Sequence, residues 1–271
     1  VAKTLLNRLS GKAGDYGRAE RKSRISFLKS SWAQQLSCMD HEEDDPGTTW
    51  NDRARKTKPD WMSPRMAWRA IQKVLPRDAI ISSDIGNNCA IGNAYPTFEE
   101  GRKYLAPGLF GPCGYGLPAI MGAKIGCPDT PVVGFSGDGA FGIAVTELTA
   151  IGRKEWPAVT MVVFRNYQWG AEKRNSTLWY DDNFVGTELD EGVSYAGIAK
   201  ACGLKGVIAK TMNELSDQLS TAIENQMKMQ HTTLIEAMIN QELGEPFRRD
   251  AMKKPVEVAG ISPSDMLTQN N

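Results

Sequence analysis

A carboxylate between two glycines follows a strongly apolar run in the middle of the chain, in the sequence Gly137-Asp138-Gly139-Ala140. A second apolar run, residues 159–164, ends in Arg165-Asn166-Tyr167-Gln168. Mg²⁺ in proteins takes oxygen ligands such as carboxylates and commonly shares them with substrate phosphates. Backbone N–H groups at the start of a helix bind phosphate oxygens. These residue types at two strand ends therefore indicate a diphosphate held by Mg²⁺.

Two asparagines follow a glycine at a third such position, in Asp84-Ile85-Gly86-Asn87-Asn88. Ligands of open parallel sheets bind beyond the carboxyl ends of the strands. We therefore expect the three segments to meet in one site that offers backbone N–H groups, amide side chains and a single carboxylate.

The glycine motif has two other interpretations. Residues 137–142 match G-x-G-x-x-G between a strand and a helix, as in dinucleotide-binding proteins. Against this, Asp138 would repel a metal-free pyrophosphate, and the next strand ends in Arg165-Asn166 where an acidic residue should bind the ribose. A looser match at residues 114–119 follows a loop. Alternatively, Asp138 simply caps a helix after a surface turn.

Apolar strands that alternate with helices predict the frame that positions these residues. Ser63-Pro64 is a strong helix start, because Ser is a favoured N-cap and Pro fits the first helical position. The strands are continuous apolar runs, as expected when both faces of a sheet are buried. The predicted fold class is α/β, a doubly wound, mostly parallel sheet with helices on both faces. Strands are expected at residues 79–86, 131–135, 159–164, 206–210 and 233–239, and helices at residues 63–75, 114–126, 145–153 and 213–229.

The first sixty residues differ from the rest. Helical patterns at residues 1–9 and 26–36 are followed by an acidic, turn-rich stretch. Because the first pattern is already under way at Val1, we expect a piece of a longer protein. Residues 1–60 would then be the end of a middle domain and a linker. Residues 61–245 would form the C-terminal ligand-binding domain, followed by a tail at 246–271.

Charge and cysteine content narrow the class of protein. Lys+Arg and Asp+Glu both number 32, so the basic surplus typical of nucleic-acid binding is absent. No apolar run is long enough to cross a bilayer, and no membrane partner is expected. The five cysteines form no CxxC pair, which favours reduced thiols and a cytoplasmic location. Two histidines are too few for a His-rich metal centre.

The glycine motif and its partners resemble those of a known family. Gly137-Asp138-Gly139 followed by Asn166 is similar to the thiamine diphosphate motif. Residues 111–119 resemble the G-x-x-G-Y-G-L-P-A segment of acetolactate-synthase-like enzymes. The resemblance implies thiamine diphosphate and Mg²⁺ as cofactors, with Asp138, Asn166 and Gln168 as metal ligands, the last through its backbone carbonyl. The cofactor-binding residues it implies are Gly86, Asn87, Asn88, Gly111, Cys113, Gly137, Asp138, Gly139, Ala140, Asn166, Gln168 and Gly170.

Two features of the family are altered or missing in this sequence. Cys113 stands where relatives carry Met, Leu or Ile to support the bent cofactor. The glutamate that activates the cofactor comes from a pyrimidine-binding domain, and nothing in the chain resembles that domain. The resemblance therefore implies a pyrimidine-binding domain on the same or a neighbouring chain, a homo-oligomer (dimer or tetramer), and a fragment that is inactive alone.

A finer resemblance concerns the substrate. Residues 83–96, 104–114 and 164–175 are similar to sulfoacetaldehyde acetyltransferases, which convert sulfoacetaldehyde and phosphate into acetyl phosphate and sulfite. Both substrates are anions, so the cation Arg165 is predicted to contact them. Trp169 is predicted to form a wall of the substrate pocket. Lys173 and Arg174 would be further cations or part of a solvated charged loop. The alternatives are an acetolactate synthase, a 2-oxo acid decarboxylase, or a non-catalytic cofactor-binding module.

Overall fold

The computed structural model describes residues 17–40, 60–98, 101, 103–180, 182–228 and 231–242. The chain divides into two compact units, residues 1–46 and 47–271, which we describe separately. In the first unit, helix α2 (Arg18–Asp40) confirms the helix predicted at 26–36 and extends it at both ends. The helix predicted at 1–9 lies outside the described residues.

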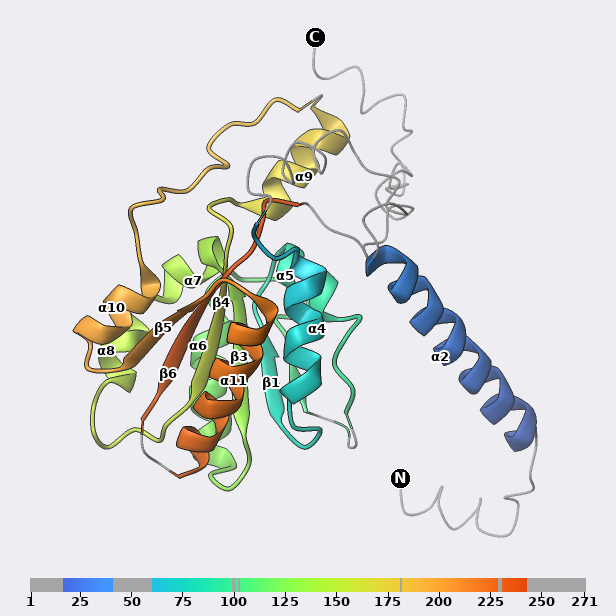
Figure 1. The fold of residues 1–271 in the computed structure, drawn as a ribbon, viewed down its shortest axis with the longest axis horizontal. Helices are drawn as coiled ribbons and strands as arrows, with labels where there is room; N and C mark the ends of the chain where they lie inside the picture. Colours follow the sequence, from blue (N-terminus) through green and yellow to red (C-terminus); the bar gives the residue numbers. More distant parts are fainter. Residues whose placement is uncertain are drawn as a thin grey trace. The chain divides into compact units, whose positions relative to one another are not determined.

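The second unit is built on one sheet of six parallel strands in the order β2-β1-β3-β4-β6-β5 (Figure 1). This confirms the predicted parallel α/β fold. The short strand β2, which pairs with β1 at one edge of the sheet, is not among the predicted strands. The strands are β1 (Ile80–Ser83), β2 (Tyr104–Leu105), β3 (Val132–Gly137), β4 (Thr160–Arg165), β5 (Lys205–Ala209) and β6 (Thr233–Met238).

Helices cover both faces of the sheet, as predicted (Figure 1). On one face, helices α6, α7, α8 and α10 bury residues such as Ile120, Phe141 and Leu148 against the strands. On the other face, α4 and α11 pack together, and Trp68 lies 4.7 Å from Phe135, ring centroid to ring centroid. The helices of this unit are α4 (Pro64–Val74), α5 (Asn87–Gly92), α6 (Gly116–Gly126), α7 (Asp138–Ala144), α8 (Glu147–Ile151), α9 (Gly170–Trp179), α10 (Tyr195–Ala201) and α11 (Met212–Met227).

The helix predicted at 145–153 differs from the observed structure. Only the short helix α8 lies within this region, and a second short helix, α7, precedes it and starts at Asp138 directly after the strand. Gly137 is its N-cap residue and has no side chain to bond the first turn. The buried Asp138 carboxylate instead accepts the N–H of Gly139 at 3.0 Å. Asp138 is thus fixed at the point where strand becomes helix.

The strand order creates a crevice at the carboxyl ends of the neighbouring strands β1 and β3. β1 leads outward to β2, whereas β3, on the other side of β1, leads on to β4. The connections that leave β1 and β3 therefore diverge, which is the topological switch point where ligands of such sheets bind. None of the helices in the described ranges has both the length and the apolar composition needed to span a membrane.

We expect Gly206→Ala to destabilise the protein, because a Cβ on β5 would lie 2.0 Å from the Ala196 carbonyl oxygen of α10. Overpacking against backbone lowers the free energy of unfolding by about 1–3 kcal/mol, which urea titration measures. Gly122→Ala is the matched control, since nothing lies within 4 Å of the added Cβ in helix α6. That substitution should stabilise by about 0.5–1 kcal/mol. Equal effects of the two substitutions would contradict the packing of α10 on β5.

Candidate functional site

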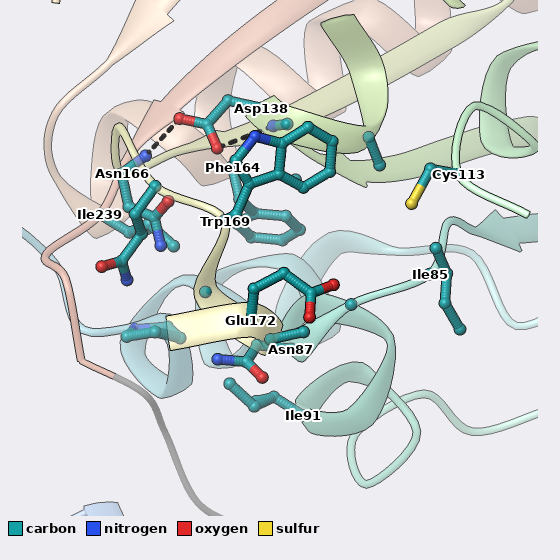
Figure 2. Close-up of a pocket in the computed structure, with 18 of the residues that line it drawn as sticks. Ile85, Asn87, Ile91, Cys113, Asp138, Phe164, Asn166, Trp169, Glu172 and Ile239 are labelled. Atoms are coloured by element: carbon teal, nitrogen blue, oxygen red, sulfur yellow. Dashed lines mark hydrogen bonds between the residues drawn. The ribbon is translucent and has the colours of Figure 1, made fainter. Parts of the chain in front are cut away.

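A cavity opens beyond the carboxyl ends of β1, β3 and β4 (Figure 2). In that view, Asp138 and Asn166 lie on one side, Asn87 and Ile91 on the other, and Glu172 between them. The structure thus brings together the three segments that the sequence analysis expected to meet. The predicted site residues that line the cavity are Gly86, Asn87, Gly111, Cys113, Gly137, Asp138, Gly139, Ala140, Asn166, Gln168, Trp169 and Gly170.

Two predicted residues stand apart from this set. Asn88 is in helix α5, but its side chain lies outside the described part of the structure. Arg165 is 1% exposed and does not line the cavity. The sequence analysis did not single out Glu172 and Glu242, which do line it. Neither acid belongs to a recognised motif, so only its position in the fold marks it.

Asp138 is the most constrained group of the site. Its Oδ2 atom accepts three hydrogen bonds, from Arg165 Nη1 at 3.1 Å and from the N–H groups of Asn166 and Tyr167 at 3.1 and 2.6 Å. Its Oδ1 atom accepts one, from the N–H of Gly139. A carboxylate oxygen offers about two lone pairs. Oδ1 is therefore the oxygen that retains a lone pair for a cation.

Burial raises the pKa of Asp138 to about 6, although Arg165 and the backbone N–H groups of Tyr167, Asn166 and Gly139 act in the opposite direction. Removing a carboxylate from water disfavours its charged form. A cation at Oδ1 would favour that form, so the environment of Asp138 suits a metal ligand.

The turn after β4 directs the amide residues toward the cavity. Tyr167 has a φ of 59°, a left-handed conformation that is uncommon outside glycine. Its N–H donates to Asp138, and its ring lies 4.1 Å from the Arg165 guanidinium carbon. These contacts hold the turn, and Asn166 and Gln168 follow the cavity wall on either side of it.

Arg165 serves a different purpose from the predicted one. We expected it to face an anionic substrate, but its Nη2 atom donates to the carbonyl oxygens of Asp190 and Val193 at 2.7 and 2.9 Å. The rest of its charge faces the Asp138 carboxylate. Both terminal nitrogens of its guanidinium thus bond to groups of the protein, and the Nε atom, which has no hydrogen-bond partner among the described residues, lies 3.9 Å from Glu236 Oε1.

The neighbouring cations are also turned away from the cavity. Lys173 is 0% exposed and pairs with Glu188. Arg174 is buried as well, so the alternative of a solvated charged loop is wrong for both residues. Among the described residues that line the cavity there is no Lys, Arg or His, whereas Asp138, Glu172 and Glu242 are acids.

Asp84 anchors the loop that carries Gly111 and Cys113. Its Oδ1 accepts the N–H of Gly114 at 3.1 Å, and its Oδ2 accepts the N–H of Gly116 at 2.8 Å. The Ile85 N–H and the Ser136 hydroxyl complete the set at 2.9 and 3.2 Å. This buried carboxylate therefore joins the ends of β1 and β3 to the loop before α6. Sequence analysis placed it beside the site but did not predict this role.

Cys113 lies across the cavity from the Asp138 end (Figure 2). Burial raises the pKa of its thiol, and the negative charges of Asp84 and Glu172 act in the same direction. A thiol that stays protonated packs as a small apolar group.

Two glycines let the backbone approach the cavity. A Cβ on Gly139 would lie 2.8 Å from ring atoms of Trp169, and one on Gly170 would lie 3.0 Å from Asn87 Nδ2. A Cβ at position 139 would therefore clash with the Trp169 ring, one at position 170 would crowd the Asn87 side chain, and main-chain atoms form that part of the wall.

Comparison with known proteins identifies the family. Residues 84–237 match the model of the thiamine pyrophosphate enzyme C-terminal TPP-binding domain. The chain belongs to the thiamine pyrophosphate enzyme family. The predicted cofactor, thiamine diphosphate, is thereby confirmed at the level of the family. The dinucleotide interpretation of the glycine motif is wrong, because the matched region includes that motif.

Several individual proteins are similar to this chain in sequence. The chain is 81% identical to the sulfoacetaldehyde acetyltransferase of Roseovarius nubinhibens, over 99% of this chain and 44% of that protein. It is 75% identical to that of Rhodobacter capsulatus, over 99% and 45%. The chain thus spans less than half the length of these relatives. Identity to the Escherichia coli acetolactate synthase isozyme 3 large subunit is 27%, over 60% of this chain and 28% of that protein.

A solved structure supports the fold alone. The thiamine diphosphate-dependent 4-hydroxybenzoylformate decarboxylase of Rhodococcus jostii superposes with a TM-score of 0.60 at 23% sequence identity. The aligned region covers 68% of this chain and 34% of that one.

The residues present fit a diphosphate with its metal. Oδ1 of Asp138 accepts one hydrogen bond and retains a lone pair for a cation, and the Oε1 atom of Gln168 is buried without a hydrogen-bond partner among the described residues. In the same ranges, no cluster of three or more His, Cys, Asp or Glu could hold a metal alone. An ion that shares ligands with a diphosphate matches a site of one carboxylate and several amides.

We expect Asp84→Asn to loosen the loop that carries Cys113, because an amide nitrogen would face N–H donors that now bond a carboxylate. Leaving a buried donor unsatisfied lowers the free energy of unfolding by about 1–3 kcal/mol. Cys113 should also react with iodoacetamide at least about three times faster, since its thiolate form is less disfavoured.

Peptide-level mass spectrometry measures this rate, with the exposed Cys127 as the internal reference. Ser136→Ala is the control, because it removes a single donor to Asp84. An unchanged ratio of Cys113 to Cys127 alkylation in Asp84→Asn would contradict the anchoring role.

Proposed function

We propose that this chain is the diphosphate-binding part of a thiamine diphosphate-dependent sulfoacetaldehyde acetyltransferase, which converts sulfoacetaldehyde and phosphate into acetyl phosphate and sulfite. The observation that carries the proposal is the 81% identity across nearly the whole chain to a protein with that name. The cavity supports it, since a buried carboxylate with one open oxygen lies among amides and close-approaching backbone.

The residues of this chain would bind the cofactor and its metal. Asp138 and Asn166 would bind Mg²⁺ through side-chain oxygens, and Gln168 through its backbone carbonyl. Gly86, Asn87 and Asn88, with the backbone of Gly139 and Ala140, would hold the diphosphate. When bound, thiamine diphosphate supplies the nucleophilic carbon and the electron sink of the reaction.

Cys113 and Trp169 would shape the space around the cofactor rings. Cys113 offers a small side chain at the position that supports the bend, and Trp169 packs on Gly139 beside the diphosphate. Their contribution is to orient the bound molecule and to exclude water from the carbon that reacts.

The cavity lacks the groups that its substrates require. Sulfoacetaldehyde and phosphate are anions, yet the described lining contains three acids and none of the basic residue types. We infer that the cations which bind these anions, like the activating glutamate, belong to other parts of the full-length protein. A pyrimidine-binding domain of the same or a neighbouring chain in a homo-oligomer would supply them. In this arrangement, residues 1–60 end the middle domain, 61–245 form the cofactor domain and 246–271 a tail.

The full-length protein should release sulfite and acetyl phosphate from sulfoacetaldehyde and phosphate, and only with thiamine diphosphate and Mg²⁺ present. Colorimetric sulfite determination and hydroxamate trapping of acetyl phosphate measure the two products. The isolated 271-residue chain is the comparison and should show no turnover. Acetolactate formation from pyruvate, without sulfite release, would favour the acetolactate-synthase alternative. Cofactor binding without any turnover would favour a non-catalytic module.

We expect Asp138→Asn to weaken Mg²⁺ binding of the full-length protein, because the neutral amide replaces the one carboxylate in the proposed ligand set of Asp138, Asn166 and Gln168. Mutating a residue that only hydrogen-bonds to a metal ligand lowers metal affinity by about 10–100-fold. Removing the charge of the ligand itself should therefore raise the Mg²⁺ concentration for half-saturation at least about 100-fold. Calorimetric titration in the presence of thiamine diphosphate measures it. Asp217→Asn, an exposed position on α11, is the control and should leave it unchanged. Equal affinities of the two variants would remove Asp138 from the ligand set.

A further inference from the structure

Arg165 is a buried cation that the proposed chemistry does not use. Its side chain is 1% exposed and lies between two buried carboxylates. Its Nη1 atom donates to Asp138 Oδ2 at 3.1 Å, and its Nε atom lies 3.9 Å from Glu236 Oε1. A buried ion pair is weak evidence for stability, since desolvation opposes the attraction of the two charges. Its presence at this point calls for a functional reason.

The guanidinium fork contacts three different segments at once. Besides Asp138 at the start of α7, it bonds the carbonyl oxygens of Asp190 and Val193, both in the connection between α9 and α10. Its flat face lies against the ring of Tyr167, in the turn after β4. A planar group with five N–H donors can make such contacts together, whereas an ammonium group cannot reproduce their directions.

These contacts give the two oxygens of Asp138 different surroundings: Oδ2 bonds to the protein, and Oδ1 accepts a single bond. Arg165 and two backbone N–H groups occupy Oδ2, which leaves its carboxylate group a single orientation. Oδ1, with one backbone donor from Gly139, is then the oxygen left for a cation. Without Arg165, only backbone N–H groups would oppose rotation of the carboxylate about the bond between Cβ and Cγ.

We propose that Arg165 is a positioning residue for the metal site: it fixes the Asp138 carboxylate so that Oδ1 faces the bound cation. The proposal rests on the proposed function, in which Asp138 binds Mg²⁺. Arg165 touches neither metal nor substrate, and it acts through the orientation of Asp138. Because Mg²⁺ demands near-ideal octahedral geometry and Ca²⁺ accepts flexible geometry, a fixed carboxylate favours Mg²⁺ over Ca²⁺.

The test compares Arg165→Met and Arg165→Lys in the full-length protein. Mg²⁺ and Ca²⁺ are titrated separately by calorimetry with thiamine diphosphate present. In both variants the half-saturating Mg²⁺ concentration should rise at least about tenfold, in the range seen when partners of metal ligands are removed. The ratio of half-saturating Ca²⁺ to Mg²⁺ should fall at least about threefold, since Ca²⁺ tolerates the loosened ligand. Arg153→Met, in an exposed pair with Glu155, is the control and should change neither quantity.

The ion ratio separates positioning from general destabilisation. A variant that is only less stable loses affinity for both ions in equal proportion, so an unchanged ratio would overturn the proposal. An Arg165→Lys protein with wild-type Mg²⁺ affinity would also overturn it, because charge alone would then suffice. The same holds if Arg165→Met binds Mg²⁺ more tightly, since Arg165 would then compete with the metal. If Arg165→Met does not fold, Arg165→Lys carries the same comparison.

The proposed function and this inference fail in distinguishable ways. A wild-type protein that binds no Mg²⁺ with thiamine diphosphate would contradict the proposed function and this inference with it. Wild-type binding with unchanged Arg165 variants would contradict this inference alone. Neither outcome depends on turnover of sulfoacetaldehyde.

Discussion

The burial of one carboxylate, Asp138, governs the architecture of the site. A charge removed from water must be compensated, and here the compensation comes from Arg165 and from three backbone N–H groups. These donors belong to the end of β4, to the turn that follows it and to the first turn of α7. The Tyr195 hydroxyl adds a bond to the Asp138 carbonyl at 2.9 Å. Satisfying one carboxylate therefore sets the relative positions of the segments that form the cavity wall.

A second buried carboxylate, Glu236, extends this organisation behind the site. It accepts the N–H groups of Tyr195 and Ala196 and the hydroxyl of Ser194, so it caps the start of α10. Arg165 lies between this residue and Asp138. One cation and two anions thus connect the cavity to a helix on the opposite side of β4. Asp84 likewise connects the loop that carries Cys113 to the ends of β1 and β3. Three buried carboxylates thus hold the segments around the cavity.

The electrostatic character of the cavity is local. The chain as a whole carries equal numbers of acidic and basic residues, yet the described lining is acidic. Of the nearby cations, Arg165 and Lys173 form ion pairs within the protein, and Arg174 is buried. In the function proposed above, this cavity would hold the metal ion and the cofactor, and other parts of the protein would bind the anionic substrates. In that proposal the chain would supply one half of an active site.

The parallel sheet and the meeting of three strand ends could be predicted from the sequence, because apolar runs and glycine turns are local signals. The sequence also pointed to Asp138 and Asn166 through a motif whose spacing is set by the helical segment between two strands, which the structure divides into α7 and α8. The tertiary structure alone decided which partner each charged side chain takes. Arg165 faces Asp138, Lys173 faces Glu188, and Glu242 reaches the cavity from the far end of the chain. Helices α5 and α9 likewise begin in polar segments without apolar periodicity. The reason is physical: the positions of most strands along the chain follow from local patterns, whereas their order in the sheet and the direction of a charged side chain depend on groups that folding brings from distant positions.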